Sequence, residues 1–197
     1  FTAHGDGAGM EANIRQLEQR HVEVCRALFG AERQPPILAG IHALLEDFER
    51  ICRGILMLGE RPPRSVDEAA ATGEKLTALL VAALLEARGV AAESVDGSEI
   101  IVTDATFGNA SPIMEKTRDR ARARLLPLIA SGTTPVMTGF NGATTDGRPT
   151  TLGRGGSDFS ASILAAVLDA EELWIWTDVD GIMTADPGVA PDAAVLD

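Results

Sequence analysis

The last third of the chain constrains the fold more than any other part, because it predicts a strand, a loop, a helix and a second strand in succession. The apolar stretch 134–140 predicts a strand, the glycine- and threonine-rich stretch 141–156 predicts a loop, and residues 157–168 predict a helix. Residues 173–177 then predict a short second strand. A strand–helix–strand unit connects parallel strands. We therefore expect an α/β fold with a mostly parallel sheet.

The preceding two thirds of the chain predict helices and two more short strands. Apolar residues at helical spacing indicate helices over residues 10–29, 39–58, 74–88 and 112–130, and short apolar runs predict strands at 90–95 and 100–103. Pro35 and Pro36 predict a break before the second helix, and Gly89 predicts the end of the third. Residues 65–68, Ser-Val-Asp-Glu, have the form of a capping box, which predicts a separate short helix that ends near Gly73.

The balance of charges limits the partners that this chain can have. Its 197 residues include 17 lysines and arginines against 29 acidic residues, which gives a net charge of −12. A nucleic-acid-binding protein usually carries a basic patch that displaces counterions from phosphates, so the acidic balance argues against one. The only lysines are Lys75 and Lys116. Nearly all the positive charge that could face an anionic substrate therefore comes from arginine.

Hydropathy and cysteine use indicate where the protein works. No run approaches the ~18 apolar residues of a membrane-spanning helix, and no signal peptide is visible. Cys25 and Cys52 do not have the spacing of a zinc or redox motif, which predicts free thiols in a reducing compartment. We therefore expect a cytoplasmic location and no membrane partner. The chain starts with Phe1 rather than methionine, which suggests an internal fragment or a numbering that skips residues.

Residues 153–158, Gly-Arg-Gly-Gly-Ser-Asp, join the glycine-rich loop to the helix that follows it. A helix N-terminus presents free backbone N–H groups and the positive end of a dipole, and Gly155 and Gly156 let the backbone approach an anion closely. Arg154 adds a guanidinium group that matches a carboxylate or a phosphate. The pattern is neither a Walker A loop nor a good dinucleotide-binding fingerprint. The alternative is an ordinary turn in which Ser157 is the N-cap.

Asp158 lies in the first turn of the same predicted helix and has two interpretations. A carboxylate there is a favourable partner for the helix dipole. It could instead orient a lysine or a magnesium-bound group beside phosphates. The residues alone leave both interpretations open.

A second loop, residues 177–181 with the sequence Thr-Asp-Val-Asp-Gly, follows the predicted strand 173–177. Ligands of open α/β sheets bind outside the carboxyl ends of the strands. Two carboxylates there could bind magnesium or hydrogen-bond a nucleotide, or aspartate and glycine could simply form a turn. Because this strand directly follows the helix 157–168, we expect both loops to open at the same edge of the sheet.

Four stretches of the sequence together resemble the aspartate kinases of the amino acid kinase superfamily. They are Thr-Gly-Phe at 138–140, Thr-Thr-Leu-Gly-Arg-Gly-Gly-Ser-Asp-Phe-Ser-Ala at 150–161, Ile-Trp-Thr-Asp-Val-Asp-Gly at 175–181 and Thr-Ala-Asp-Pro at 184–187. Their order and spacing both agree with the family. The resemblance is strong over residues 65–197 and faint over residues 1–60. It implies a three-layer αβα sandwich with a central, mostly parallel sheet that is incomplete at the N-terminus.

The resemblance also implies a reaction. The β-carboxylate of L-aspartate would attack the γ-phosphate of ATP and give aspartyl phosphate, with Mg²⁺ as a cofactor, in the first step toward lysine, threonine and methionine. A carboxylate is already a nucleophile and needs no general base, so catalysis has to come from positioning and charge stabilisation.

Particular residues match the family's site. The resemblance implies that Glu74 holds the α-amino group of aspartate, that Arg154 grips its α-carboxylate, and that Phe140 and Ser157 line the same pocket. It implies a catalytic role for Asp158. The nucleotide contacts that it implies are Gly155, Gly156, Thr177, Asp178, Met183, Asp186 and Pro187.

The sequence also departs from the family's pattern. The family's lysine-bearing Lys-Phe-Gly-Gly-Thr-Ser motif and its C-terminal regulatory domains are not found in residues 1–197. We therefore expect one catalytic domain whose charge clamp is incomplete within these residues. Met183 stands where the family often has an aromatic residue, and Gly188 where it often has arginine.

Two alternatives stay open. The chain could belong to another amino acid kinase, acting on glutamate, acetylglutamate or carbamate, or to a non-catalytic regulatory module with the same fold. We expect the full-length protein, monofunctional or fused to a homoserine dehydrogenase, to be a homo-oligomer.

Overall fold

A computed structural model describes residues 6–176, 181, 183–185 and 188–195. In chain order, its helices and strands are α1 (Gly7–Leu28), α2 (Gln34–Leu58), α3 (Pro63–Ala87), β1 (Ala92–Val95), α4 (Gly97–Ile100), β2 (Val102–Thr103), α5 (Met114–Ala130), β3 (Thr134–Met137), β4 (Asn141–Thr144), β5 (Pro149–Thr151) and α6 (Gly156–Leu168).

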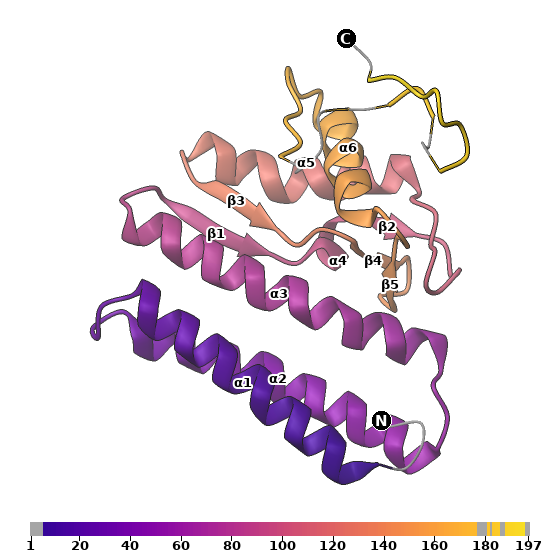
Figure 1. Cartoon of the computed structure of the whole chain (residues 1–197). Coiled ribbons are helices and arrows are strands. Elements are labelled where there is room, and N and C mark those ends of the chain that lie inside the picture. The colour runs from indigo at the N-terminus through magenta and orange to yellow at the C-terminus, as the bar shows by residue number, and fades with distance from the viewer. Residues whose placement is uncertain (1–5, 177–180, 182, 186–187, 196–197) are drawn as a thin grey trace.

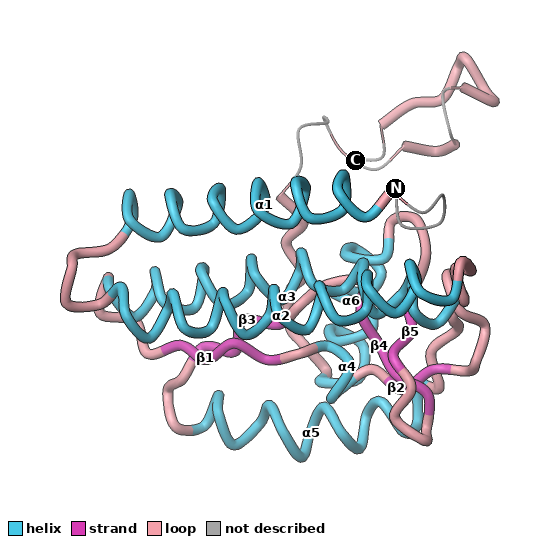
Figure 2. Tube along the Cα trace, turned by 90° about the horizontal axis from the view of Figure 1, so that it is seen from below, coloured by secondary structure: helices cyan, strands magenta, loops and turns pink. Residues whose placement is uncertain are grey.

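The strands lie between two layers of helices. Figure 1 shows α3 along one face of the strands and α5 and α6 on the other. The α1–α2 hairpin packs outside α3, so that α1 is the element farthest from the strands on that side (Figure 2). The α/β class and the three-layer arrangement expected from the sequence are confirmed. In the described part of the chain, no helix combines the length and the apolar character needed to cross a membrane.

The strands form two groups with parallel pairs in both. Strands β1 and β3 pair in parallel, with Ala92 opposite Thr134. Strands β2 and β4 also pair in parallel, with Val102 opposite Ala143. Strand β5 then returns antiparallel to β4, with Asn141 opposite Thr151. The strand pairing is therefore mostly parallel, with one antiparallel pair, the β4–β5 hairpin.

The hairpin corrects the prediction that residues 141–156 form a loop. Glycine and threonine suggested a loop, but threonine is β-branched and suits a strand when its hydroxyl finds a partner. The hydroxyls of Thr103 and Thr150 are hydrogen-bonded to each other at 2.7 Å across the buried face. Thr144 Oγ1 donates to the carboxylate of Asp146 in the turn.

The strand predicted over 173–177 is wrong for residues 173–176, which form no strand. A strand needs a neighbour for its backbone N–H and C=O groups, and no described strand pairs with this segment. Trp174 and Trp176 are consequently 70% and 87% exposed. The centroids of their two rings are 6.2 Å apart. Thr177 lies outside the described residues.

Two predicted helix boundaries are also wrong. Helix α2 begins at Gln34, with the prolines in its first turn, where the missing N–H would have no helical partner anyway. Helix α3 runs without interruption from Pro63 to Ala87 and passes through Gly73, and no side chain caps its start. Its continuous buried face supports one long helix instead of two. Gly89 ends α3 as predicted, and the Val90 N–H donates to Leu85 O beyond it.

The apolar core has two main parts, which lie on the two sides of the layer of strands. The first lies between the strands and helices α5 and α6, and its buried members are Val95, Ile100, Ile101, Ala121, Leu125, Leu152, Ile163 and Val167. The second joins α1, α2 and α3 through Cys25, Phe29, Ile37, Ile41, Leu45, Leu76 and Leu80. Both cysteines are buried free thiols, as predicted, and burial raises the pKa of each. Leu152 connects the first core directly to the glycine-rich turn that follows β5.

Candidate active site

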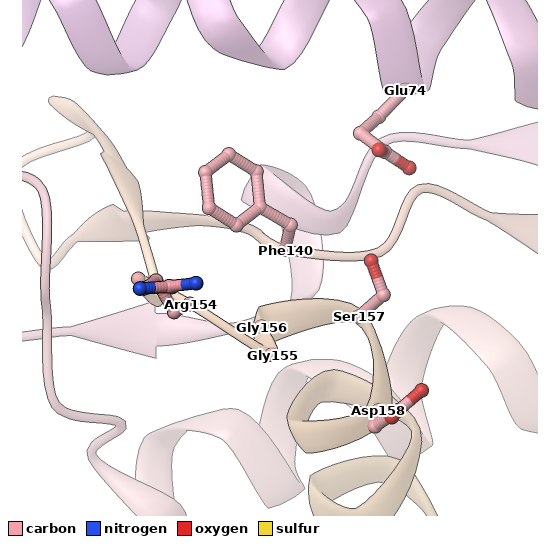
Figure 3. A pocket seen from close by; sticks show the side chains of 8 residues that line it. Glu74, Phe140, Arg154, Gly155, Gly156, Ser157 and Asp158 are labelled. Atoms are coloured by element: carbon pink, nitrogen blue, oxygen red, sulfur yellow. The ribbon is translucent and has the colours of Figure 1, made fainter. Parts of the chain in front are cut away.

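A cavity of about 430 Å³ opens between α3, Phe140 in the segment that joins β3 to β4, and the N-terminus of α6. Its lining residues are Glu74, Phe140, Gly153, Arg154, Gly155, Gly156, Ser157 and Asp158. A cavity of this size suits a small ligand. The structure therefore brings together the substrate-binding residues that the sequence indicated, with Asp158 and two of the expected nucleotide contacts (Figure 3).

The turn that carries Arg154 starts helix α6 without a side-chain cap. Gly155 is the N-cap, with a φ of 70°, and no side chain accepts a hydrogen bond from the first turn. The alternative that Ser157 is the N-cap is therefore wrong. Because the first N–H groups of a helix have no carbonyl four residues earlier to bond, this end of α6 presents backbone donors beside the cavity.

Phe140 is held in an uncommon backbone conformation at the centre of the site. Its φ is 67°, in the left-handed region that non-glycine residues rarely adopt. Its N–H donates to Ser160 Oγ at 2.9 Å, and its carbonyl accepts from Leu152 N at 2.9 Å. Strained residues of this kind cluster at functional sites. The sequence indicated Phe140 but not Ser160, although Ser160 lies within the stretch 150–161 that resembles the aspartate kinases.

The turn and Phe140 fit closely together. A Cβ on Gly156 would lie 2.7 Å from Phe140 Cδ2, and a Cβ on Gly139 would lie 2.9 Å from Ser157 Oγ. In Figure 3, Ser157 points toward the Phe140 and Glu74 side of the site, and Asp158 lies farther along the first turn of α6. The shape of the cavity therefore depends on glycine at position 156.

The cavity has an acidic and a basic side chain on opposite sides. Glu74 projects from α3 and is half-buried, and Arg154 is exposed on the turn. Figure 3 shows the Phe140 side chain between them. Desolvation raises the pKa of Glu74, because burial disfavours the charged carboxylate. Among the described residues, Arg154 forms no ion pair, so its guanidinium is available to an anion. The arrangement can bind a small molecule that carries both a cation and an anion.

A buried carboxylate that does not line the cavity is a residue that the sequence did not indicate. Asp67 is 3% exposed and accepts hydrogen bonds from Gly108 N and from the N–H and hydroxyl of Thr151. The sequence suggested only that it belonged to a capping box. Its partners lie 41 and 84 residues away, so no local pattern could have identified them.

Comparison with known proteins decides the family. The sequence model of a protein family that is described as the amino acid kinase family matches residues 4–197. This chain belongs to the amino acid kinase family. The β4–β5 hairpin and the glycine-rich turn that follows it are thus elements of an amino acid kinase fold.

The family members that this chain resembles are aspartokinases. It is 37% identical over 161 residues to lysine-sensitive aspartokinase 3 of Escherichia coli (strain K12), a match that covers 79% of this chain and 36% of that protein. It is 43% identical over 138 residues to an aspartokinase of Mycolicibacterium smegmatis, covering 69% of this chain and 32% of that protein. The chain therefore spans about a third of the length of these curated relatives.

A solved structure shows the same fold. The structure of E. coli aspartokinase III in complex with aspartate and ADP superposes with a TM-score of 0.84 at 31% sequence identity, covering 98% of this chain and 42% of that one. The amino acid kinase fold therefore extends over nearly the whole of this chain.

Of the other expected nucleotide contacts, Met183 is the one that falls within the described residues. Thr177, Asp178, Asp186 and Pro187 lie outside the described residues. Met183 is described, pairs with Val195 in an isolated antiparallel bridge, and does not line the cavity. The described residues therefore assemble the Glu74–Arg154 part of the site, and the roles assigned to the nucleotide contacts stay predictions.

Proposed function

We propose that the protein containing this chain is an aspartate kinase, which transfers the γ-phosphoryl group of ATP to the β-carboxylate of L-aspartate. The observation that carries the proposal is the placement of Glu74 and Arg154 on opposite sides of one small cavity. An α-amino acid is a zwitterion, and this pair offers one partner for each of its charges. The similarity to aspartokinases supports aspartate as that amino acid.

The α-ammonium and the α-carboxylate of aspartate each have a specific partner in this proposal. The Arg154 guanidinium grips the α-carboxylate through paired N–H donors. The Glu74 carboxylate accepts from the α-ammonium group, and the positive charge of that group stabilises Glu74 in its ionised form despite its raised pKa. Phe140 and Ser157 close the pocket around the carbon chain. The β-carboxylate is then left unpaired, free to act as the nucleophile.

The N-terminus of α6 faces the phosphoryl group in this proposal. Gly155 and Gly156 allow the backbone to approach an anion, and the N–H groups of the first turn stabilise the charge that develops on it. Asp158, exposed at the cavity wall, has the catalytic role of orienting the groups that surround the phosphates. No general base is needed.

Magnesium fits this donor set as a companion of the nucleotide. Mg²⁺ is usually bound by substrate phosphates, waters and one or two carboxylates. Within the part of the chain that the structure describes, no cluster of three or more acidic, histidine or cysteine side chains could hold a metal, and Asp158 is the one exposed carboxylate on the cavity wall. Asp158 would hold a water of the metal, and the ion would supply positive charge to the phosphates.

The remaining properties follow from this assignment. We propose that residues 1–197 belong to the catalytic domain and that the complete enzyme is a cytoplasmic homo-oligomer. Two buried free thiols suit a reducing compartment, and the net charge of −12 suits a protein with no nucleic-acid partner.

Trapping of the acyl phosphate tests the proposal. The complete reading frame that contains this chain is incubated with ATP, Mg²⁺, hydroxylamine and one of aspartate, glutamate, acetylglutamate or carbamate. We expect hydroxamate from aspartate and much less from the others. Hydroxamate from glutamate or acetylglutamate in preference to aspartate would assign another amino acid kinase activity, and no hydroxamate from any of them in a folded protein would favour a non-catalytic module.

A further inference from the structure

Asp67 is a buried carboxylate that is neutralised by no cation in the part of the chain that the structure describes. It is 3% exposed, and no ion pair of the described residues includes it. Three donors satisfy it instead: Gly108 N at 2.8 Å, Thr151 N at 3.0 Å and Thr151 Oγ1 at 3.0 Å. A buried charge is costly unless it is hydrogen-bonded, and hydrogen bonds to a charged acceptor are the strong ones. The contacts of Asp67 therefore fix the relative positions of the segments that they join.

Two of these segments carry the charged side chains of the cavity, Glu74 and Arg154. Glu74 lies seven residues after Asp67 on α3, and two turns of an α-helix place both on the same face. Arg154 lies three residues after Thr151, in the turn between β5 and α6. The Asp67–Thr151 contact thus joins the helix of Glu74 to the segment of Arg154.

The same carboxylate also fixes the loop behind the glycine-rich turn. Its bond to Gly108 N holds the loop that precedes α5. The next residue is Asn109, and a Cβ on Gly153 would lie 2.4 Å from its Oδ1. Ala110 N then donates to Thr151 O at 2.8 Å. The position of the loop 108–110, which packs against Gly153, therefore depends on Asp67.

We propose that Asp67 is a positioning residue that sets the separation between Glu74 and Arg154, and so the affinity for the amino acid that they hold. The inference rests on the proposed function, because it assumes that these two side chains bind the substrate. Asp67 itself does not line the cavity and acts through Thr151 and α3.

Four single substitutions, made in the complete reading frame, test the inference. Asp67→Asn keeps the shape of the side chain but presents an amide group to the N–H donors. Thr151→Val removes only the hydroxyl, and Thr151→Ser restores it. The matched control is Thr117→Val on α5, because Thr117 is also fully buried and its hydroxyl bonds to Val102, but it does not line the cavity. For each protein, kcat, the KM values for aspartate and ATP, and the Tm are measured.

We expect Asp67→Asn and Thr151→Val to raise the KM for aspartate by about tenfold or more, because small displacements of binding groups have large kinetic effects. The change in kcat should be smaller, as for a loss of substrate binding. Thr151→Ser should stay near the wild type, and Thr117→Val should lower the Tm without changing the KM for aspartate.

Two results would overturn the inference. In the first, Thr151→Val and Thr117→Val change the KM for aspartate equally at the same loss of Tm, which would make the contact merely structural. In the second, a folded Asp67→Asn or Thr151→Val enzyme keeps the wild-type KM. If Asp67→Asn does not fold, the pair of Thr151 variants decides the matter. A failure of the proposed function is seen separately, as a wild-type protein that makes no aspartyl hydroxamate, and it would remove the inference as well.

Discussion

The backbone N–H of Phe140 donates a hydrogen bond to the hydroxyl of Ser160 at 2.9 Å. This contact holds Phe140 at a φ of 67°, with its side chain between Glu74 and Arg154 (Figure 3). Ser160 Oγ also donates to Gly156 O at 2.7 Å. One buried hydroxyl on α6 thus connects the residue at the centre of the cavity to the turn that forms its wall.

Replacing Ser160 with alanine should therefore both destabilise the protein and loosen the site. The Phe140 N–H would lose its acceptor, at a cost of about 1–3 kcal/mol in the free energy of unfolding. The KM for aspartate should rise because Phe140 can leave its left-handed conformation. Thermal unfolding and hydroxamate kinetics measure the two effects. Ser162→Ala is the control, because Ser162 is exposed on the same helix and donates to Asp158 O in the same way. Equal effects of the two substitutions would contradict the role of Ser160.

Replacing Gly156 with alanine should disturb the same contact from the opposite side. The new methyl group would lie 2.7 Å from Phe140 Cδ2 and 3.2 Å from Leu152 Cβ, and overpacking of this kind costs about 1–3 kcal/mol. We expect a lower Tm and a higher KM for aspartate. The control is Gly54→Ala on α2, where nothing lies within 4 Å of the new Cβ and alanine should stabilise the helix by about 0.5–1 kcal/mol. A Gly156→Ala protein as stable and active as the wild type would show that the turn and Phe140 are not closely packed.

The raised pKa of Glu74 predicts a specific dependence of stability on pH. Because burial makes this carboxyl harder to ionise in the folded protein, its ionisation opposes folding. The stability that it contributes is present below the ordinary glutamate value of 4.5 and is lost as the pH rises through the raised folded-state pKa. Glu74→Gln should consequently raise the Tm above that of the wild type at neutral pH.

This difference in Tm should shrink as the pH falls toward 4.5. Unfolding curves over a pH series, without ligand, give the measurement, and Glu86→Gln on the exposed surface of the same helix controls for the loss of one negative charge. A Glu74→Gln protein that is less stable than the wild type at neutral pH would mean that the carboxylate is stabilised in the fold by a partner.

The local part of the site could be predicted from the sequence. Residues 153–158 combine glycines with a helix start, so the order of residue types alone indicated an anion-binding turn. Glu74 and Phe140 were indicated only by resemblance to a family, since one acid on a helix and one phenylalanine after a strand carry no signal of their own. The structure places all three elements around one cavity.

The parts that could not be predicted depend on contacts between distant segments. Asp67 looked like a capping residue because its true partners, Gly108 and Thr151, are 41 and 84 residues away. The β4–β5 hairpin looked like a loop because the pairing of the Thr103 and Thr150 hydroxyls is not visible in the sequence. Conversely, the apolar run 173–176 looked like a strand, but its apolar character does not supply the neighbouring strand that pairing requires.

The central claim is that Glu74 binds the α-ammonium group of aspartate and that Arg154 binds its α-carboxylate. Succinate lacks only the amino group, and β-alanine lacks only the α-carboxylate, so the two analogues separate the two contacts. The most direct test measures kcat/KM for aspartate, succinate and β-alanine in the complete wild-type enzyme and in its Glu74→Gln and Arg154→Gln variants. The account predicts that the wild type disfavours both analogues, that Glu74→Gln loses discrimination against succinate only, and that Arg154→Gln loses discrimination against β-alanine only. Unchanged discrimination in both variants would contradict it.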